Sequence, residues 1–261
     1  REYVQNWLWK DENSVAKYYK NVMGFDGWRF DYVLGFEDFV IKDWLEAVGG
    51  FSVSELWDGN PNVLRNHIEA TGSGVFDFAA FYVMEQAFDR NHDLTGLTND
   101  QVWQTNPEKA VTFTANHDTE KDGNEDNIIA PENKLKAYAF IMTHPGYPTV
   151  FYLDYENPEF QDQLNKLIRI HNSLATGSLE VTYADNDEYI MQRSGNAENP
   201  GLVLYINTSG NTKRRTITTS WDTRVLMDYS ENSNYSPMVE ENGEVTIEAP
   251  GNSYAIWSIT K

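Results

Sequence analysis

GWRFD at residues 27–31, SELWD at 54–58 and TANHD at 114–118 are the stretches of this sequence that decide its fold. Each is a short apolar run of the kind found in buried strands, and each ends at charged or polar side chains. In a parallel barrel the carboxyl ends of the strands meet on one face, where enzymes of this architecture place their catalytic groups. The three segments therefore predict one polar site at the ends of three separate strands.

Helical and strand-like stretches alternate from the start of the chain to about residue 176, which predicts a parallel sheet with helices between its strands. Asn60 followed by Pro61 is a typical start of a helix, and the pair Gly49-Gly50 is a typical end. The predicted strands are 27–33, 51–57, 75–80, 110–115 and 149–152, and the predicted helices are 7–22, 41–48, 61–70, 81–89, 99–105, 133–142 and 160–175.

The pattern changes after Gly177, where short strand-like runs are separated by Gly, Asn and Pro. This pattern is typical of an all-β sandwich. We therefore predict two domains, an α/β domain of barrel type over residues 1–177 and a C-terminal β-sandwich domain over residues 178–261. The expected strands of the second domain are 179–183, 188–193, 202–207, 214–219, 223–228, 245–248 and 253–259.

Composition excludes several classes of function. The 261 residues carry a formal net charge of −20, which argues against nucleic acid and anionic membranes as partners because both need basic patches. The absence of cysteine excludes disulfides and thiolate metal sites. No apolar run approaches the ~18 residues of a membrane-spanning helix. The chain begins with Arg1 and shows no signal peptide, so we expect a processed or excised product.

Arg29 and Asp31 lie two residues apart, so in a strand their side chains share a face. A guanidinium beside a carboxylate favours the ionised acid, which is the form that a nucleophile needs. A structural ion pair explains the same spacing equally well.

Glu55 follows the apolar residues 51–53 and precedes Leu56 and Trp57. An apolar setting favours the neutral form of a carboxyl group, which suits a general acid that later acts as a base. The alternative is a glutamate that caps the next helix. Trp57 lies two residues after Glu55, so we expect it on the same face, where it either stacks on a sugar ring or packs against a neighbouring loop.

His117 and Asp118 close the fourth predicted strand. They are suited to bind sugar hydroxyls and to stabilise positive charge beside a reacting carbon, although an Asn-His-Asp segment is also a common polar turn. Taken with Asp31 and Glu55, they give the complementary carboxyl groups that cleavage of a glycosidic bond requires.

At these residues the chain resembles the α-amylases of glycoside hydrolase family 13. The segments that resemble the family's strand-four, strand-five and strand-seven signatures are GFDGWRFDYVLGF (24–36), SELW (54–57) and FTANHDT (113–119). Segments similar to the archaeal and plant-type subgroup are WLWK (7–10), KAVTFTANHDT (109–119) and PTVFYLDYE (148–156).

The resemblance implies roles for the site residues. Asp31 would be the nucleophile, Glu55 the general acid/base and Asp118 the stabiliser of the transition state. Arg29 and His117 would be supporting, substrate-binding residues. The implied reaction is retaining hydrolysis of internal α-1,4 bonds in starch or glycogen, and the implied fold is a (β/α)8 barrel followed by a β-sandwich.

The sequence departs from the family pattern in three ways. Nothing before Gly24 matches the earlier strand-three signature, so we expect only the C-terminal part of the (β/α)8 TIM barrel, about strands 4–8, before the sandwich. Leu34 stands where the subgroup usually has a lysine, which puts one sugar contact in doubt. Calcium, which full-length relatives bind, would keep here the backbone carbonyl of Gly35 as its one remaining ligand.

About five strands cannot close a barrel of eight, and their open edges invite pairing with another chain. We expect a truncated product of a secreted enzyme that acts outside the cell or in the periplasm, completed by the complementary N-terminal barrel half or by a second copy. The isolated chain is expected to have little or no activity. Two alternatives to a hydrolase are a non-catalytic α-glucan-binding or assembly subunit and a related α-glucan transglycosylase.

Overall fold

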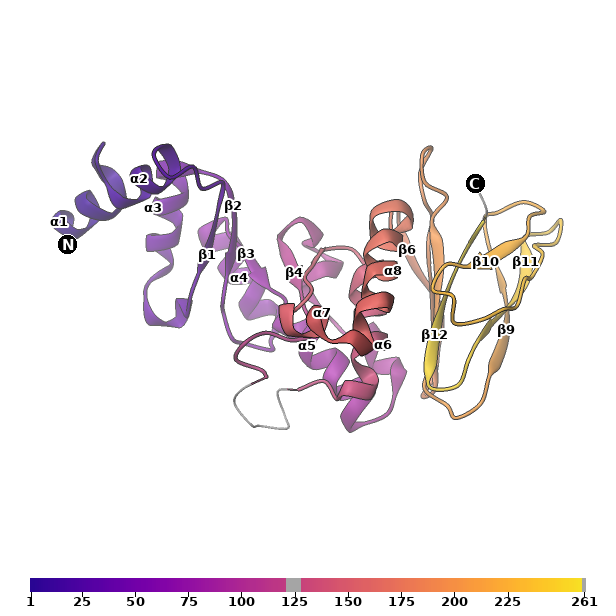
Figure 1. Ribbon diagram of the computed structural model, residues 1–261. Helices are drawn as coiled ribbons and strands as arrows, with labels where there is room; N and C mark the ends of the chain where they lie inside the picture. Colours follow the sequence, from indigo (N-terminus) through magenta and orange to yellow (C-terminus); the bar gives the residue numbers. More distant parts are fainter. Residues whose placement is uncertain (121–127, 260–261) are drawn as a thin grey trace. The chain divides into compact units, whose positions relative to one another are not determined.

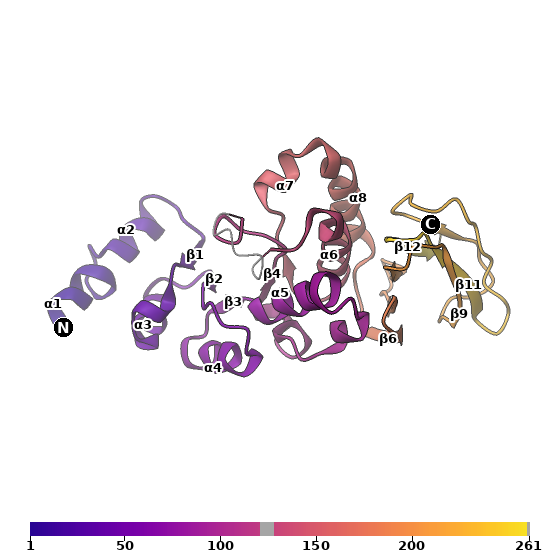
Figure 2. The ribbon, with the colours of Figure 1, turned by 90° about the horizontal axis from the view of Figure 1, so that it is seen from below.

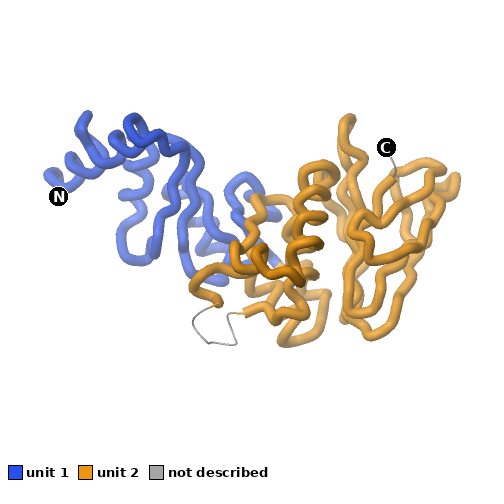
Figure 3. The backbone as a smooth tube through the Cα atoms, viewed as in Figure 1, with its two compact units in different colours: residues 1–80, 100–112 blue, residues 81–99, 113–261 orange. Residues whose placement is uncertain are grey.

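The computed structural model of the protein describes residues 1–120 and 128–259 (Figure 1). The chain divides into two compact units, which Figure 3 distinguishes by colour. Unit 1 comprises residues 1–80 and 100–112, and unit 2 comprises residues 81–99 and 113–261.

Unit 1 contains four strands that pair in parallel, each with the next along the chain. These strands are β1 (Gly27–Phe30), β2 (Phe51–Ser54), β3 (Gly74–Phe76) and β4 (Ala110–Thr112). Gly27 lies opposite Phe51, and Val53 lies opposite Gly74. The parallel sheet confirms the fold class, although each strand is shorter than the apolar run that predicted it.

The helices that accompany these strands begin and end at the expected signals. Asn60 caps α4 because its side chain accepts a hydrogen bond from the amide of Asn62 (3.0 Å), and Gly49 ends α3 with a positive φ of 61°. The helices are α1 (Glu2–Gln5), α2 (Val15–Asn21), α3 (Asp38–Val48), α4 (Pro61–Thr71) and α5 (Phe78–Glu85), with a π-helical turn at Asn6–Lys10 and 3-10 turns at Val33–Gly35, Val102–Gln104 and Pro107–Lys109.

Two predicted elements of unit 1 are wrong. The single helix expected over 7–22 is interrupted at residues 11–14, between the π-helical turn and α2. The strand expected over 75–80 ends at Phe76, and α5 starts at Phe78. The cause is Asp77, whose carboxylate accepts the amide hydrogen of Ala80 (2.9 Å) and so begins a helix within the apolar run.

Unit 2 starts with helical segments, and α6 packs against α8 in both ribbon views (Figures 1 and 2). Leu164, Leu167 and Leu174 on α8 are buried, as their spacing predicts. The predicted strand 149–152 is wrong, because α7 begins at Tyr152. The elements are a π-helical turn at Gln86–Arg90, a 3-10 helix at Leu94–Thr98, α6 (Pro131–Thr143), β5 (Tyr147–Pro148), α7 (Tyr152–Glu156) and α8 (Pro158–Leu174). Over the described part of the chain, no helix has the length and apolarity needed to cross a bilayer.

Two antiparallel sheets follow α8 and enclose a core that includes Val203, Ile247 and Trp257, so the predicted β-sandwich is confirmed. The larger sheet has the order β10-β12-β8-β7-β6, and β11 pairs with β9 in the smaller one. The strands are β6 (Leu179–Ala184), β7 (Glu188–Arg193), β8 (Leu202–Asn207), β9 (Lys213–Thr218), β10 (Leu226–Asp228), β11 (Glu244–Ala249) and β12 (Ser253–Ile259).

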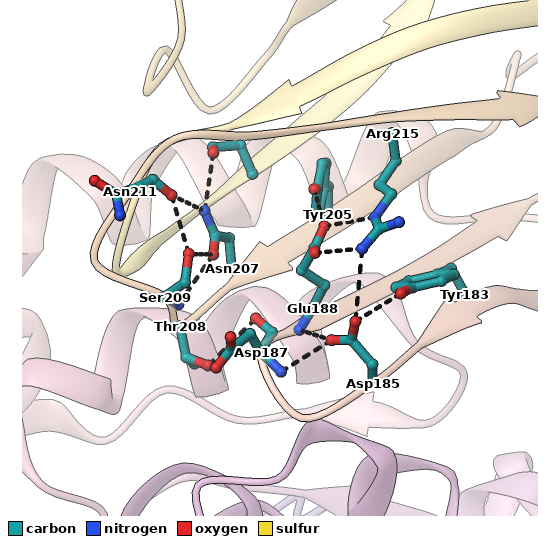
Figure 4. A network of polar contacts seen from close by, with 11 residues as sticks. Tyr183, Asp185, Asp187, Glu188, Tyr205, Asn207, Thr208, Ser209, Asn211 and Arg215 are labelled. Atoms are coloured by element: carbon teal, nitrogen blue, oxygen red, sulfur yellow. Dashed lines mark hydrogen bonds and ion pairs between the residues drawn. The ribbon is translucent and has the colours of Figure 1, made fainter.

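A polar network ties the two sheets together (Figure 4). Arg215 of the smaller sheet donates two hydrogen bonds (2.7 and 3.0 Å) to the buried carboxylate of Glu188 and stacks over the ring of Tyr183. Burial alone would raise the pKa of Glu188, but hydrogen bonds from Arg215 and Tyr205 lower it below its usual range. Because Glu188 lies 1% exposed, the pair fixes the two sheets at a defined register.

Candidate active site

Arg29, Asp31 and Glu55 meet at the carboxyl ends of β1 and β2. The guanidinium of Arg29 places Nη1 at 2.6 Å from Oδ1 of Asp31 and Nη2 at 2.6 Å from Oε1 of Glu55. One cation therefore holds two carboxylates side by side. Sequence spacing predicts the contact between Arg29 and Asp31, but it gives no sign that the same guanidinium also binds Glu55.

Backbone hydrogen bonds continue the sheet past the ends of the strands and fix Glu55 in place. The amide of Glu55 donates to the carbonyl of Phe30 (2.9 Å), and the amide of Val33 donates to the carbonyl of Glu55 (3.2 Å). The first bond continues the parallel pairing of β1 with β2 by one step, whereas in the second bond Val33 takes the place that Tyr32 would have in a regular ladder. The Glu55 side chain consequently emerges beside the residues that follow β1.

Tyr32 supplies a further donor to the site through its backbone. Its amide lies 3.1 Å from Oε2 of Glu55, so both carboxylate oxygens of Glu55 accept a hydrogen bond. Tyr32 has a left-handed backbone conformation, with φ 44° and ψ 58°, which is uncommon for a residue other than glycine. Sequence reasoning misses this role, because no side-chain pattern signals that a tyrosine adopts such a conformation.

The two acids differ in exposure. Glu55 is 7% exposed, whereas the Asp31 side chain is 71% exposed. Arg29 lies between them and over the ring of Phe76, with 5.9 Å from the guanidinium carbon to the ring centroid. Glu55 was expected in apolar surroundings, but it is bound by a cation and an amide. An accessible carboxylate thus stands next to a buried carboxyl group, which is an arrangement suited to nucleophilic and acid/base roles.

Trp57 packs against Phe78, with the ring centroids 4.8 Å apart and the rings tilted by 32°. Because β2 ends at Ser54, the alternation of faces within a strand does not govern the direction of Trp57. Phe78 is buried and Trp57 is partly exposed. The packing seen here is that of a side chain which supports the loop after β2.

His117 and Asp118 lie on a tight turn in unit 2. His117 Nε2 is 3.2 Å from Oδ2 of Asp118, and about half of each side chain is exposed. The side chain of Asn116 closes the turn by accepting hydrogen bonds from the amides of Asp118 (2.8 Å) and Thr119 (2.9 Å). The backbone of this segment therefore forms the polar turn that the sequence allows as an alternative. The same turn presents the imidazole of His117 beside the carboxylate of Asp118.

The predicted site residues thus form two groups. Arg29, Asp31 and Glu55 are in contact within unit 1, and His117 and Asp118 are in contact within unit 2.

A hollow of about 800 Å³ in unit 1 is lined by residues that follow the two acids along the chain, including Leu34, Gly35 and Leu56. Asp38 and His67 also line it, and they are bound to each other at 2.8 Å between Oδ1 and Nδ1. No group of three or more acidic, histidine or cysteine side chains in the described ranges 1–120 and 128–259 is placed to hold a metal ion. The carbonyl of Gly35 on its own does not make a calcium site.

The chain is similar in sequence and in fold to known proteins. The sequence profile of the α-amylase C-terminal family matches residues 202–258. The chain is 29% identical to an α-amylase of Geobacillus stearothermophilus, over 94% of this chain and 48% of that protein. It is 27% identical to the cytoplasmic α-amylase of Escherichia coli strain K12, over 90% of this chain and 53% of that protein.

The chain is therefore similar to α-amylases over most of its length. It spans about half the length of these α-amylase relatives. The solved structure of an Anoxybacillus α-amylase superimposes with a TM-score of 0.75 at 19% identity, over 95% of this chain and 62% of that one. This superposition supports the same fold, a partial barrel followed by a β-sandwich.

Proposed function

We propose that the chain carries the catalytic groups of a retaining hydrolase of α-1,4-glucans. The observation that carries the proposal is the pair of carboxylates, Asp31 and Glu55, held by the single guanidinium of Arg29 at the ends of neighbouring parallel strands. Retaining glycosidases need two carboxyl groups close enough for one of them to attack the sugar directly, and a shared guanidinium keeps these two close.

In the first step, the Asp31 carboxylate attacks the anomeric carbon while Glu55 donates a proton to the departing glycosidic oxygen. The bond between the two sugars breaks and an ester forms between the sugar and Asp31. In the second step, Glu55 takes a proton from water, which attacks the same carbon and releases Asp31. Both acids return to their starting protonation state, so the cycle balances.

The supporting groups have distinct roles in this proposal. Asp118 stabilises the positive charge of the oxocarbenium-like transition state, and His117 beside it binds a sugar hydroxyl. Arg29 orients Asp31. The turn supports these roles because it exposes about half of each side chain. Trp57 remains a candidate sugar contact because it is partly exposed.

The proposed substrate is starch or glycogen, cleaved at internal α-1,4 bonds. The names of the matched relatives support this class, and the segments at residues 7–10, 109–119 and 148–156 favour the archaeal and plant-type subgroup. We assign catalysis to residues 1–177 and a supporting role to the sandwich at 178–261. A polymer substrate favours action outside the cell or in the periplasm. Calcium is included in the proposal only because the family resemblance implies that full-length relatives bind it.

We further propose that the free edge of β1 is covered by the complementary N-terminal barrel half. Within residues 1–120 and 128–259, β1 is hydrogen-bonded to β2 alone, and Trp7, Val22 and Leu34 of the same unit are exposed. An unpaired strand beside apolar side chains is suited to accept another strand. Light scattering tests this assignment, because a dimer of the 261-residue chain would identify a second copy as the occupant.

The experiment that tests the function is release of reducing ends from soluble starch. It is run on the full natural polypeptide that contains the chain and on the 261-residue chain, each with Asp31→Asn and with the control Asp43→Asn on α3. We expect hydrolysis by the full polypeptide, its loss in the Asp31 variant only, and little activity of the 261-residue chain. Starch binding with no hydrolysis would identify a binding subunit, and products longer than the substrate would identify a transglycosylase.

A further inference from the structure

Lys134 on α6 is a buried lysine, with 5% of its surface exposed. Its ammonium group donates a hydrogen bond to Oδ1 of Asp154 (2.7 Å) and another to Oε1 of Glu120. Lysines are seldom buried unless paired, because removing an ammonium group from water is costly. All three residues belong to unit 2, and they come from α6, α7 and the turn that carries Asp118.

Asp154 forms the fixed end of this arrangement. Its second carboxylate oxygen accepts a hydrogen bond from the hydroxyl of Tyr138 on α6 (2.7 Å), and that hydroxyl accepts one from the amide of Phe151 (3.2 Å). Burial, together with the charge of Asp154, raises the pKa of Tyr138 well above its usual range, so the hydroxyl keeps its proton. Lys134 and Asp154 are thus anchored to each other and to α7.

Glu120 is the second acid that Lys134 binds, and it lies two residues after Asp118 in the sequence. Its amide donates to the carbonyl of Asn116 (3.2 Å), so the backbone of Glu120 closes the same turn that Asn116 holds from inside. Lys134 donates to Glu120, and this ion pair joins the turn to α6.

Charge balance alone does not require Glu120. Lys134 and Asp154 already form a neutral buried pair, each with a side chain that is 6% exposed, whereas the Glu120 side chain is 30% exposed and so remains open to water. A surface carboxylate that gives up hydration to bind an already paired ammonium gains little stability for the fold.

We propose that Lys134 is a positioning residue: through Glu120 it fixes the turn at residues 116–120 and thereby the direction of Asp118. The catalytic meaning of this role rests on the function proposed above, but the restraint on the turn does not. The alternative is that the three residues form purely structural ion pairs and that the contact between Lys134 and Glu120 does not restrain the turn.

The test is Glu120→Gln, which keeps the shape of the side chain and the pair of Lys134 with Asp154. The matched control is Glu132→Gln, an exposed position on the first turn of α6. Hydrogen exchange of the amides of Asp118 and Thr119 is followed by mass spectrometry or NMR. We expect exchange roughly tenfold faster in the Glu120 variant and unchanged in the control. Unchanged exchange in the Glu120 variant would overturn the proposal.

Hydrolysis of soluble starch by the full natural polypeptide provides the second readout. With the turn loosened, kcat is expected to fall about tenfold or more while KM changes little, because a small misplacement of a catalytic group acts mainly on the transition state. If kcat is unaffected although exchange is faster, Asp118 does not act as proposed and the positioning role is overturned. If the parent polypeptide shows no hydrolysis, the function fails, and exchange alone decides whether Lys134 restrains the turn.

Discussion

Unit 1 and unit 2 bury their large apolar side chains to very different extents. In unit 1, Tyr3, Trp7 and Val22 are 81%, 60% and 68% exposed, whereas Tyr138 and Trp257 of unit 2 are fully buried. Unit 1 contains short parallel strands, of which β1 pairs with β2 alone among the described residues, and unit 2 contains an antiparallel sandwich. A run of parallel strands buries its apolar surface only when a barrel or a sheet is complete, whereas a sandwich encloses its own core.

The comparison indicates that the two acids Asp31 and Glu55 lie in the less completely buried unit. The contact of Arg29 with Asp31 and Glu55 lies in unit 1, where apolar surface remains uncovered. The buried core of the sandwich and the ion pair between Glu188 and Arg215 lie in unit 2. Unit 2 is therefore expected to hold its structure independently, and unit 1 is expected to depend on a partner that covers it.

The largest losses of activity are expected when one of the three proposed catalytic acids is replaced. The loss should be greater for Asp31 and Glu55 of unit 1 than for Asp118 of unit 2. Replacing Glu55 with Gln removes the proton donor and should lower kcat about 10²–10⁴-fold, and Asp31→Asn should cost at least as much. Asp118→Asn removes an electrostatic contact and should cost about 10²–10³-fold. Starch hydrolysis by the full natural polypeptide measures all three. A greater loss for Asp118→Asn than for Asp31→Asn would reverse the assignment of roles.

Two matched tryptophan substitutions sharpen the difference in burial. Trp257→Ala should lower the free energy of unfolding by about 3–5 kcal/mol, because it leaves a cavity in the sandwich core. The same change at the exposed Trp7 should alter it by less than about 0.5 kcal/mol. Denaturant unfolding of each variant measures both values. A large loss in the Trp7 variant would mean that the start of the chain is packed in solution and that unit 1 is more complete than its exposed surface indicates.

Two buried groups, one in each unit, should make opposite contributions to the pH dependence of stability. Burial lowers the pKa of His144 in unit 2 to about 3, from an ordinary value of 6.5. The unfolded chain therefore binds a proton that the folded chain resists, so unit 2 should lose ~3 kcal/mol or more as the pH falls from 6.5 toward 3. Burial raises the pKa of Asp77 in unit 1 from 3.8 to about 6. The stability that this group contributes is full below 3.8 and is lost as the pH rises through 6.

Hydrogen exchange at pH 4 and pH 7 resolves these two responses, because it reports on each unit separately. His144→Gln should flatten the acid-side loss in unit 2, and Asp77→Asn should flatten the opposite trend in unit 1. A pH dependence that stays the same in both variants would show that neither group contributes as its pKa shift predicts.

The smallest effect is expected at His117. Its imidazole contacts Asp118 and is half exposed, so His117→Asn should lower kcat/KM by about tenfold, as for the loss of one sugar hydrogen bond, and leave stability unchanged. The control is His92→Asn, at an exposed histidine for which no role is proposed. A loss as large as that of Asp31→Asn would show that His117 takes part in bond cleavage.

Much of the fold follows from local sequence signals. Asn60 with Pro61 begins α4, Gly49 ends α3, and the change of pattern after Gly177 precedes the antiparallel strands. The contact of Arg29 with Asp31 follows from the period of a strand. These features were predictable because neighbouring residues alone determine them.

The remaining features depend on contacts between distant residues or on rare backbone conformations. The apolar run after Asp77 reads equally well as strand or helix until the carboxylate of Asp77 caps it. The amide of Tyr32 reaches Glu55 only because Tyr32 is left-handed. Lys134 joins Glu120 and Asp154 across 14 and 20 residues of sequence, and no local pattern specifies such a triad.

Covalent trapping would identify the nucleophile directly. The full natural polypeptide is incubated with 5-fluoro-α-glucosyl fluoride, whose fluoride leaves readily and whose ring fluorine slows hydrolysis of the ester, and the labelled peptide is located by mass spectrometry. We expect a sugar ester on Asp31 that is absent in Asp31→Asn. A protein that hydrolyses starch but carries the label on another residue, or carries none, would contradict the assignment of Asp31 as the nucleophile.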